Sequence, residues 1–518
     1  MFQSLELQSL EERMNMFDSL IAKAHLDSKS FQRDGLKWCL ERELSSDDVK
    51  GGIVADEMGL GKTILMIGLI YSHFVRRTLV VLPVALLKQW QQAILKITGH
   101  EALIYYGKGR KKVTKDQLRS ARIVLTTYNI VTLCAYDKAS LLHTTRWSRI
   151  IYDEAHHLRN AATTRHVGCN SLTSKICWVV SGTPIQNRIA DLKSLCSVIG
   201  LKLVITDLKT PELRNAFLRK YVLKRTKLQV GIDLPPLSIE TVTVPWSNRT
   251  EQHMAIDIHH SLGFSNVKCD KRSAMKMAFA KQIPLILLMR ARQACVMPIL
   301  MKKQLFTMHE EGEAKFNETH INAIKANSKI NAVVNMVIER KDNGTGKLIF
   351  CHYTKEIDEI KMRLLAGGLK KVVTYDGRTG KNTNILTEPA DALILQIQTG
   401  CEGLNLQEHY SEIYFVSPHW NPAVEDQAIA RCYRIGQRKP VNVYKYIMDN
   451  FDNETKSDKK QEKIILNTND TEIIVDLDLE SDKTLTIENY VNIVQGRKRQ
   501  LIAELLEQAK VEDHVLSN

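Results

Sequence analysis

The segment GGIVADEMGLGKT, Gly51 to Thr63, decides the fold of this chain. Its first part, GGIVA, predicts a buried strand, and its last part leads into the apolar helical stretch TILMIGLIYSHF. In a strand–loop–helix of this kind the backbone N–H groups of the loop converge on an anion, and the helix dipole favours negative charge. The segment therefore predicts a phosphate-binding loop at the start of a helix.

Within this loop, Lys62 is expected to reach the β- and γ-phosphates of ATP, and the Thr63 hydroxyl is expected to hold Mg²⁺. Gly59 and Gly61 allow the backbone to approach the phosphates. The strict pattern G-x-x-x-x-G-K-T has glycine where this chain has Asp56. The predicted nucleotide contacts in the loop are Asp56, Glu57, Met58, Gly59, Leu60, Gly61, Lys62 and Thr63.

A second motif, DEAH (Asp153 to His156), follows the apolar residues RIIY. A carboxylate at the end of a buried strand lies at the edge of a sheet, where it can coordinate a metal ion. We expect Asp153 to hold Mg²⁺ and Glu154 to orient or deprotonate the attacking water. Alone, DEAH is more often an exposed strand end, but after a GKT loop it indicates ATP hydrolysis.

A third string, SPHWNPAVEDQAIARCYRIGQ (Ser417 to Gln437), contains Arg431 and Arg434. If the segment is helical, both guanidinium groups lie on one face and can stabilise charge on a transferred phosphoryl group. Without the other motifs, two surface arginines would be the better interpretation. Gln427 of this string is a further predicted nucleotide contact.

Short apolar strands alternate with helical stretches in two sets. Buried strands that alternate with helices indicate a parallel sheet covered on both faces, so each set predicts one α/β lobe. The expected strands are 51–55, 78–83, 121–128, 149–154 and 177–183 in the first set, and 347–353, 370–377, 392–397, 412–418 and 441–447 in the second.

The expected domains follow from these sets. A nucleotide cleft is expected between the two lobes. Near the end, an acidic stretch predicts a solvated insertion, and residues 486–508 have the apolar spacing of a closing helix. In order, the domains are an N-terminal helical segment (1–30), an ATP-binding lobe (31–247), a helical protrusion or linker (248–340) and a second lobe (341–518) with the acidic insertion (451–482).

Composition restricts the class of protein. The 518 residues carry a net charge of +14, which suits a polyanionic partner, although a diffuse excess only favours solubility. The ten cysteines include no C-x-x-C pair, which argues against a zinc ribbon, finger or RING. We expect no signal peptide and no membrane partner, because no apolar run approaches the ~20 residues that span a bilayer.

Contacts with a nucleic-acid backbone need only Lys, Arg, hydroxyl and backbone N–H groups. Basic clusters at 108–112, 224–225, 271–272 and 497–499 are candidates, although each alone is more often a solvated face. Strand ends supply further candidates, namely Pro83, Thr126, Thr127, Thr399 and, in the third string, Trp420.

Together these strings resemble the Swi/Snf-type DNA-dependent ATPases of helicase superfamily two. FQRDGLKW (31–38) is similar to the family's Q-motif region, so the resemblance implies that Gln32 contacts adenine. Residues 417–437 are the most specific string, because DNA translocases carry it and DEAH RNA helicases do not. Further similar segments are 78–90 (motif Ia), 221–227 and 234–237 (the end of the first lobe) and 287–298 (the helical protrusion).

The resemblance implies two RecA-like lobes and a Mg²⁺-dependent ATPase driven by double-stranded DNA. It further implies translocation rather than strand separation, partners among transcription or chromatin proteins, and action in the nucleus. It does not indicate the oligomeric state. The compact length resembles the baculovirus global transactivators, a branch of that family.

One motif departs from the family pattern, and two alternatives stay open. IQTGCEGLNLQ (397–407) has Glu402 where the family has a small residue near the expected DNA path. The alternatives are a strand-separating helicase on DNA or RNA, and a DNA-binding transcriptional scaffold with little turnover.

Overall fold

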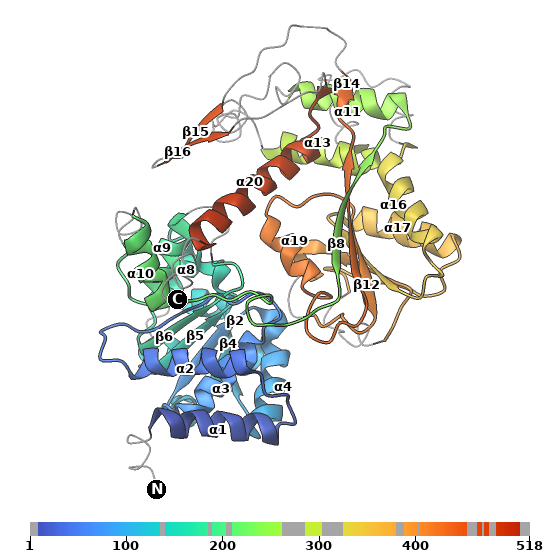
Figure 1. Cartoon of the computed structure of the whole chain (residues 1–518). Helices are drawn as coiled ribbons and strands as arrows, with labels where there is room; N and C mark the ends of the chain where they lie inside the picture. Colours follow the sequence, from blue (N-terminus) through green and yellow to red (C-terminus); the bar gives the residue numbers. More distant parts are fainter. Residues whose placement is uncertain are drawn as a thin grey trace, which may run out of the picture.

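The structure is a computed structural model. It describes residues 9–134, 140–184, 189–203, 210–261, 285–302, 325–379, 388–400, 404–452, 464–468, 471–475 and 483–507. Within these residues the chain forms two α/β lobes, blue to green and yellow to orange in Figure 1. Glu402, the basic pair 271–272 and most of the acidic insertion lie outside the described residues.

The first lobe contains a seven-stranded parallel sheet in the order β3-β4-β2-β5-β6-β1-β7. The five strands expected from the sequence are confirmed, and the short β3 and β7 are added at the edges. Because the strands are parallel, their carboxyl ends meet at one edge, which carries the motifs. The strands are β1 (Lys50–Val54), β2 (Thr78–Leu82), β3 (Leu103–Ile104), β4 (Ile123–Thr127), β5 (Trp147–Asp153), β6 (Ser174–Val180) and β7 (Val222–Leu223).

Helices cover both faces of this sheet, as the pattern of buried strands predicts. α1 (Leu10–Lys23), α2 (Ser30–Leu44), α3 (Lys62–Ser72) and α4 (Leu87–Thr98) bury their apolar side chains against one face. The N-terminal helical segment expected within 1–30 is α1, which packs in this core and so forms part of the first lobe. The other side of the lobe has α5 (Lys115–Ser120), α6 (Tyr128–Cys134), α7 (Leu141–Thr144), α8 (Thr164–Asn170), α9 (Ile189–Val198) and α10 (Pro211–Tyr221).

The second lobe contains a six-stranded parallel sheet in the order β10-β11-β9-β12-β13-β8. Its sixth strand, β8, lies in the range that was expected to belong to the first lobe, yet it pairs with β13 along its whole length. Local sequence shows that β8 is a strand but not which sheet it joins. The strands are β8 (Leu237–Val244), β9 (Gly346–Cys351), β10 (Val372–Tyr375), β11 (Ala392–Gln396), β12 (Tyr410–Phe415) and β13 (Val441–Met448).

The helices of the second lobe also lie on two sides. α13 (Leu285–Val296), α16 (Ser328–Glu339) and α17 (Thr354–Ala366) pack in one core, and α19 (Pro422–Ile429) packs in the other. α11 (Arg249–Ser261) lies beyond α13, and α18 (Ile397–Gly400) follows β11. α16 packs against the sheet, so the end of the expected protrusion belongs to the second lobe.

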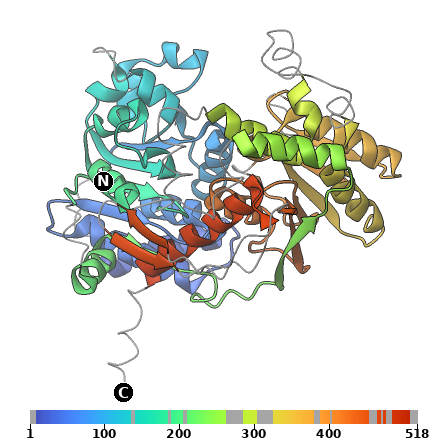
Figure 2. The same ribbon diagram turned by 90° about the horizontal axis from the view of Figure 1, so that it is seen from above.

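The C-terminal part contains the predicted closing helix, α20 (Ile487–Glu507), which lies between the two lobes in Figures 1 and 2. Before it, β14 (Phe451–Asp452) pairs with β17 (Lys483–Thr484), so the acidic insertion leaves and returns at one point. Inside the insertion, β15 (Ile464–Thr468) and β16 (Thr471–Val475) form an antiparallel hairpin, which was not expected in a solvated segment. Among the helices described, none is long and apolar enough to cross a membrane.

Candidate active site

The phosphate loop connects β1 to α3 at the carboxyl edge of the first sheet. Gly59 and Gly61 have φ angles of 93° and 78°, a left-handed backbone that strains any side chain. A Cβ atom on Gly61 would lie 2.4 Å from Nε2 of Gln32. That amide also donates to the backbone oxygen of Leu60 at 3.4 Å, so the Q-motif glutamine supports the loop.

Lys62, the first residue of α3, folds back over the loop. Its Nζ donates to the backbone oxygens of Asp56 at 2.8 Å and Glu57 at 3.3 Å. Removal from solvent lowers the pKa of Lys62, while the carboxylates of Glu154, Asp56 and Asp153 oppose that shift. The lysine is therefore positioned where phosphate oxygens could replace the loop carbonyls as acceptors.

The departure from the strict loop pattern has a structural explanation. Asp56 is 1% exposed, and its two carboxylate oxygens accept from Nε and Nη2 of Arg225 at 3.0 and 2.5 Å. Arg225 Nη1 also donates to the backbone oxygen of Phe31 in α2. The sequence placed Arg225 in a basic cluster for nucleic acid, but this side chain instead joins the loop to α2.

Asp153 ends β5, and its carboxylate is fixed on both oxygens. Oδ2 accepts from Nε1 of Trp90 at 2.7 Å, and Oδ1 accepts from the backbone N–H of Glu154 at 3.0 Å. Glu154 has a φ of 49°, which is uncommon for a residue other than glycine and marks a constrained backbone. Nδ1 of His156 lies 3.3 Å from Oε2 of Glu154.

The pKa values of the two neighbouring carboxylates, Asp153 and Glu154, are shifted in opposite directions. Burial and the charge of Glu154 raise the pKa of Asp153. Burial also acts to raise the pKa of Glu154, but His156, Lys62 and Arg431 lower it below its usual value. Glu154 is therefore the carboxylate that keeps its charge, and its electrostatic neighbours come from both lobes.

The segment that includes SGTP, after β6, packs against the phosphate loop. Ser181 N–H donates to the backbone oxygen of Val54 at 3.0 Å, which continues the pairing of β6 with β1. A Cβ atom on Gly182 would lie 2.7 Å from Cγ of Met58 and 3.3 Å from Nζ of Lys62. A side chain at position 182 would press on Met58, so this segment packs closely against the phosphate loop.

The arginines of the second lobe do not lie on a helix, so the condition for their sharing one helix face is not met. α19 ends at Ile429, and Arg431 and Arg434 lie in the turns that follow. The backbone N–H groups of Arg431 and Tyr433 bond back to α19, and Cys432 is fully buried. We call residues 430–436 the arginine turn.

This arginine turn lies on the phosphate loop of the first lobe. A Cβ atom on Gly59 would be 3.2 Å from Cβ of Arg434. Nζ of Lys227 donates to the backbone oxygen of Tyr433 at 3.1 Å and lies 2.9 Å from Oε1 of Glu57. Lys227 was not identified from the sequence as a site residue, because its partners are distant along the chain.

Two polar groups beside this contact have no hydrogen-bond partner within the described part of the chain. They are Nε of Arg431 and Nε2 of Gln427, a residue that is 4% exposed. Arg434 donates to Asn405, and burial lowers its pKa to about 10. An unsatisfied buried donor costs about 1–3 kcal/mol, so these groups fit a ligand that supplies acceptors.

The donor set fits magnesium. No group of three or more potential metal-binding side chains occurs in the described residues, which disfavours a cage built by protein alone. Mg²⁺ is commonly held by one or two carboxylates together with substrate phosphates. Asp153 supplies such a carboxylate, and Thr63 at the start of α3 supplies a hydroxyl group.

The predicted nucleic-acid contacts are less well supported. Thr126 is fully buried and donates to the backbone oxygen of Tyr105 at 2.9 Å, and Thr127 is 3% exposed. Neither hydroxyl is available to a phosphate in this arrangement. Pro83 is buried at the end of β2, Thr399 lies in α18, and Trp420 is half-buried with Arg292 over its ring at 5.7 Å.

Comparison with known proteins agrees with this geometry. Residues 31–300 match the sequence model of the SNF2-related domain, and residues 328–436 match that of the helicase conserved C-terminal domain. The chain belongs to the SNF2-related family. It is a helicase-like ATPase with two parallel-sheet lobes, as expected from its motifs.

Individual relatives vary in length. A probable global transactivator of Orgyia pseudotsugata multicapsid polyhedrosis virus is 28% identical over 81% of this chain and 86% of its own length. An uncharacterized ATP-dependent helicase of Mycoplasma genitalium is 26% identical over 82% of this chain, which spans only 40% of that relative. The Sulfolobus solfataricus SWI2/SNF2 ATPase core in complex with dsDNA is 22% identical, with a TM-score of 0.38, over 82% of this chain and 88% of that one.

Proposed function

We propose that this SNF2-family protein is a Mg²⁺-dependent ATPase that is driven by double-stranded DNA and moves along it. The observation that carries this proposal is the contact between the arginine turn and the phosphate loop. Because groups from both lobes surround one site, binding and loss of the γ-phosphate would change how the lobes fit together. Such a cycle can move a duplex past the protein.

Each side chain would have one role in this cycle. The loop N–H groups and Lys62 would bind the phosphates, and the ionised Glu154 would orient the attacking water. Arg431 and Arg434 would stabilise charge on the transferred phosphoryl group, since an arginine fork matches phosphate oxygens. Mg²⁺ held by Thr63 and Asp153 would neutralise phosphate charge.

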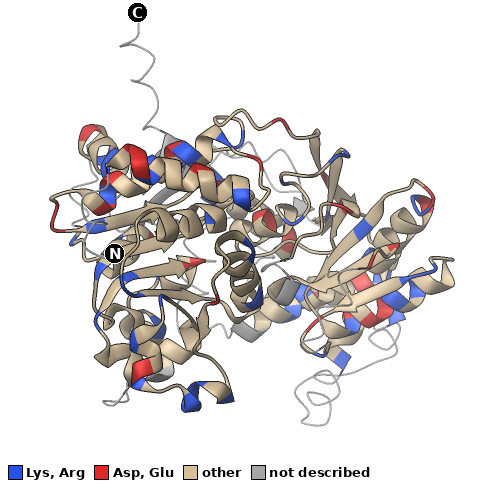
Figure 3. Ribbon diagram, turned by 90° about the horizontal axis from the view of Figure 1, so that it is seen from below, with Lys and Arg blue, Asp and Glu red and all other residues tan. Residues whose placement is uncertain are grey.

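The exposed 3₁₀ turn η3 (Lys108–Lys112) is the nucleic-acid contact that the structure supports best. It follows β3 at the carboxyl edge of the first sheet, the edge that also carries the phosphate loop. Lys108, Lys111 and Lys112 are exposed and form no ion pair within the described residues. Elsewhere Lys and Arg are interspersed with Asp and Glu over both lobes (Figure 3).

The biological setting is also proposed from relatives. The viral relative is named as a transactivator, and another match is named a chromodomain-helicase-DNA-binding protein. These names support a role in transcription or chromatin and action in the nucleus.

A displacement assay tests the proposed movement. With ATP, we expect the protein to release a third strand from a triplex while leaving a plain labelled duplex intact. Changing Lys108, Lys111 and Lys112 to alanine should weaken duplex binding and reduce the salt slope by roughly 0.9 per lost phosphate contact. A variant with Lys355, Lys361 and Lys370 changed to alanine loses the same three charges and controls for net charge. Efficient separation of the plain duplex would favour the strand-separating helicase instead.

A further inference from the structure

A buried carboxylate of the second lobe lies in α19, the helix that ends just before the arginine turn. Glu425, in the first turn of α19, is 0% exposed. Oε2 accepts from Nζ of Lys445 in β13 at 2.6 Å. Oε1 accepts from the backbone N–H of His419 at 2.7 Å and from Nε2 of Gln495 in α20 at 2.7 Å. This carboxylate therefore joins β13, α19 and α20.

α20 makes three further contacts with residues around the start of α19. Gln495, 1% exposed, also donates to the backbone oxygen of His419. Nη2 of Arg499 lies 2.9 Å from Oδ1 of Asp426. Nζ of Lys498 donates to the backbone oxygen of Trp420 at 3.2 Å. The start of α19 is thus held mainly by one face of α20.

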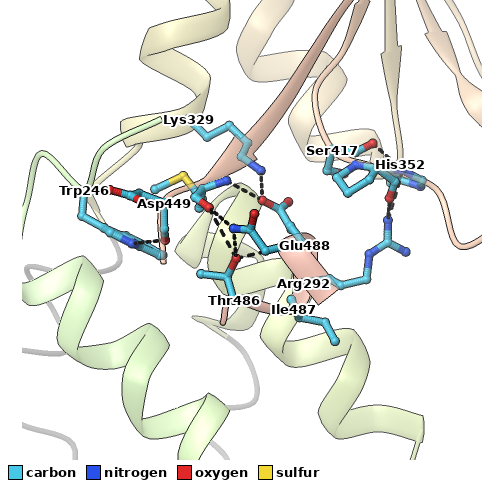
Figure 4. A network of polar contacts seen from close by, with 12 residues as sticks. Trp246, Arg292, Lys329, His352, Ser417, Asp449, Thr486, Ile487 and Glu488 are labelled. Atoms are coloured by element: carbon cyan, nitrogen blue, oxygen red, sulfur yellow. Dashed lines mark hydrogen bonds and ion pairs between the residues drawn. The ribbon is translucent and has the colours of Figure 1, made fainter. Parts of the chain in front are cut away.

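α20 is itself fixed at its N-terminus to the rest of the second lobe (Figure 4). Glu488 and Lys329 of α16 form an ion pair in which both side chains are 0% exposed. Glu488 also accepts from the backbone N–H of Met448 at 2.9 Å, and Ile487 N–H donates to Nε2 of His259 at 3.0 Å. A helix anchored in this way can serve as a rigid support.

α20 extends towards the first lobe (Figures 1 and 2). Burial lowers the pKa of Lys498, Arg159 lowers it further, and Asp191 raises it. Arg159 directly follows η4 (Ala155–Leu158), the short helix of the DEAH segment, and Asp191 is in α9. Both of these charged neighbours of Lys498 belong to the lobe that binds the phosphates.

We propose that Glu425, held by Gln495 of α20, is a positioning residue that fixes α19 and so sets the arginine turn over the phosphate loop. Arg431 lies two residues beyond α19 and is bonded back to it, so a shift of α19 moves its guanidinium group. The inference rests on the proposed role of Arg431 in ATP turnover. It assigns α20 a part in turnover that is separate from ATP binding.

The test compares Glu425→Gln and Gln495→Leu with Asn492→Ala, a change on the same helix at a side chain that forms no hydrogen bond within the described residues. ATP turnover is measured without nucleic acid, so the result does not depend on the DNA proposal. We expect kcat to fall about 10- to 100-fold for the first two variants, because a misplacement near 1 Å can have that effect. KM for ATP should stay within about threefold, because the phosphate loop is unchanged.

Two readouts separate positioning from a general loss of structure. Affinity for ADP with aluminium fluoride should fall, while affinity for ATPγS should not, because the arginine turn acts on the transferred phosphoryl group. Combining Glu425→Gln with Arg431→Ala should give an enzyme no slower than Arg431→Ala alone, because both changes remove one interaction. Thermal unfolding of each variant verifies the fold, and Gln495→Leu serves if Glu425→Gln does not fold.

Each contrary result has its own meaning. Additive losses in the double variant, or equal losses of both analogue affinities, would overturn the positioning role. If Arg431→Ala is slow but turnover is unchanged in both Glu425→Gln and Gln495→Leu, the positioning role is overturned. The proposed function would then remain intact. If turnover is unchanged in Arg431→Ala, Arg431 has no role in the proposed ATP turnover, and the positioning role of Glu425 is overturned as well.

Discussion

The two lobes present their halves of the nucleotide site in different states. In the first lobe three of the charged groups are already bonded within the protein: Lys62 to loop carbonyls, Asp56 to Arg225, and Asp153 to Trp90. In the second lobe, Arg431 and Gln427 have donors without partners in the described residues. This difference suggests that the first half is prepared to bind ATP, whereas the second completes its contacts only with the reacting phosphate.

The largest effect should come from breaking the first half. Lys62→Ala should remove the only lysine of the phosphate loop and reduce turnover below detection, with ATP affinity also weakened. Steady-state ATPase assays and ATP binding measure both losses, and Lys96→Ala, an exposed lysine in α4, is the control. Normal turnover of a folded Lys62→Ala enzyme would remove the assignment of the loop.

The next largest effect should come from changing the half of the nucleotide site that the second lobe supplies. Arg434→Ala should lower kcat on the order of 10²- to 10³-fold, as loss of one preorganised donor does, and spare ATP affinity. Comparison of kcat with the ATP dissociation constant tests this. If both quantities change equally, Arg434 makes a ground-state contact, and the contrast between the halves is lost.

The support beneath the first half should matter less for turnover than for stability. Arg225→Met leaves the buried Asp56 carboxylate without its cation, so the free energy of unfolding should fall by about 3 kcal/mol. The exposed pair of Arg33 with Asp18 provides the control, because Arg33→Met should cost no more than about 1 kcal/mol. Urea unfolding compares the two. Equal stability of both variants would show that the loop does not depend on Arg225.

Acid should weaken the first lobe. Burial acts to raise the pKa of Glu43, but the charge of Arg149 and hydrogen bonds from His73 and Arg149 bring it to about 2, below its usual 4.5. The ionised Glu43 carboxylate therefore stabilises the fold above about pH 4.5. As the pH falls towards about 2, this contribution to the free energy of unfolding, about 2–3 kcal/mol, is lost. Urea unfolding at pH 3 to 6 should therefore show the advantage of wild type over Glu43→Gln shrinking with acid. A constant difference would contradict the assignment.

In the second lobe, the stability contributed by Glu356 should fall as the pH rises, the opposite of the pH dependence at Glu43. Burial raises the pKa of Glu356 to about 7, against hydrogen bonds from the N–H groups of Tyr353 and His352. The folded state therefore keeps a proton that the unfolded chain loses above about pH 4.5, and stability declines as the pH rises towards 7. Relative to wild type, Glu356→Gln should gain about 2 kcal/mol between pH 5 and 8. A pH-independent difference in urea unfolding would argue against a protonated Glu356.

Local sequence predicted the parts of the site better than their connections. The ten expected strands are all present, since each combines an apolar run with flanking turn residues. The Asp56–Arg225 pair joins residues 169 positions apart, and no local pattern shows such a partner. Likewise, the three-residue spacing of Arg431 and Arg434 puts both on one face only if the segment is helical, but the segment forms a turn with Cys432 buried and Arg434 close to Gly59.

The hydroxyl groups at strand ends show the same limit. Thr126 was a reasonable phosphate contact by its position in the chain, but the neighbouring backbone of Tyr105 takes its hydrogen bond. Whether a polar group at a sheet edge faces solvent depends on the strand beside it, here the two-residue β3, which was not expected. The sequence therefore locates the carboxyl edge of the sheet, but it does not show which side chains at that edge can still contact a phosphate.

The steady-state Mg²⁺-ATPase rate, measured without nucleic acid and with duplex DNA, single-stranded DNA or RNA, tests most directly whether duplex DNA drives this enzyme. Lys62→Ala serves as the blank. If duplex DNA drives the enzyme, it should stimulate turnover strongly, and the other two nucleic acids should do so little. Stimulation by single strands or RNA alone would contradict this in favour of a helicase, and absence of turnover under every condition would leave a nucleotide-binding scaffold.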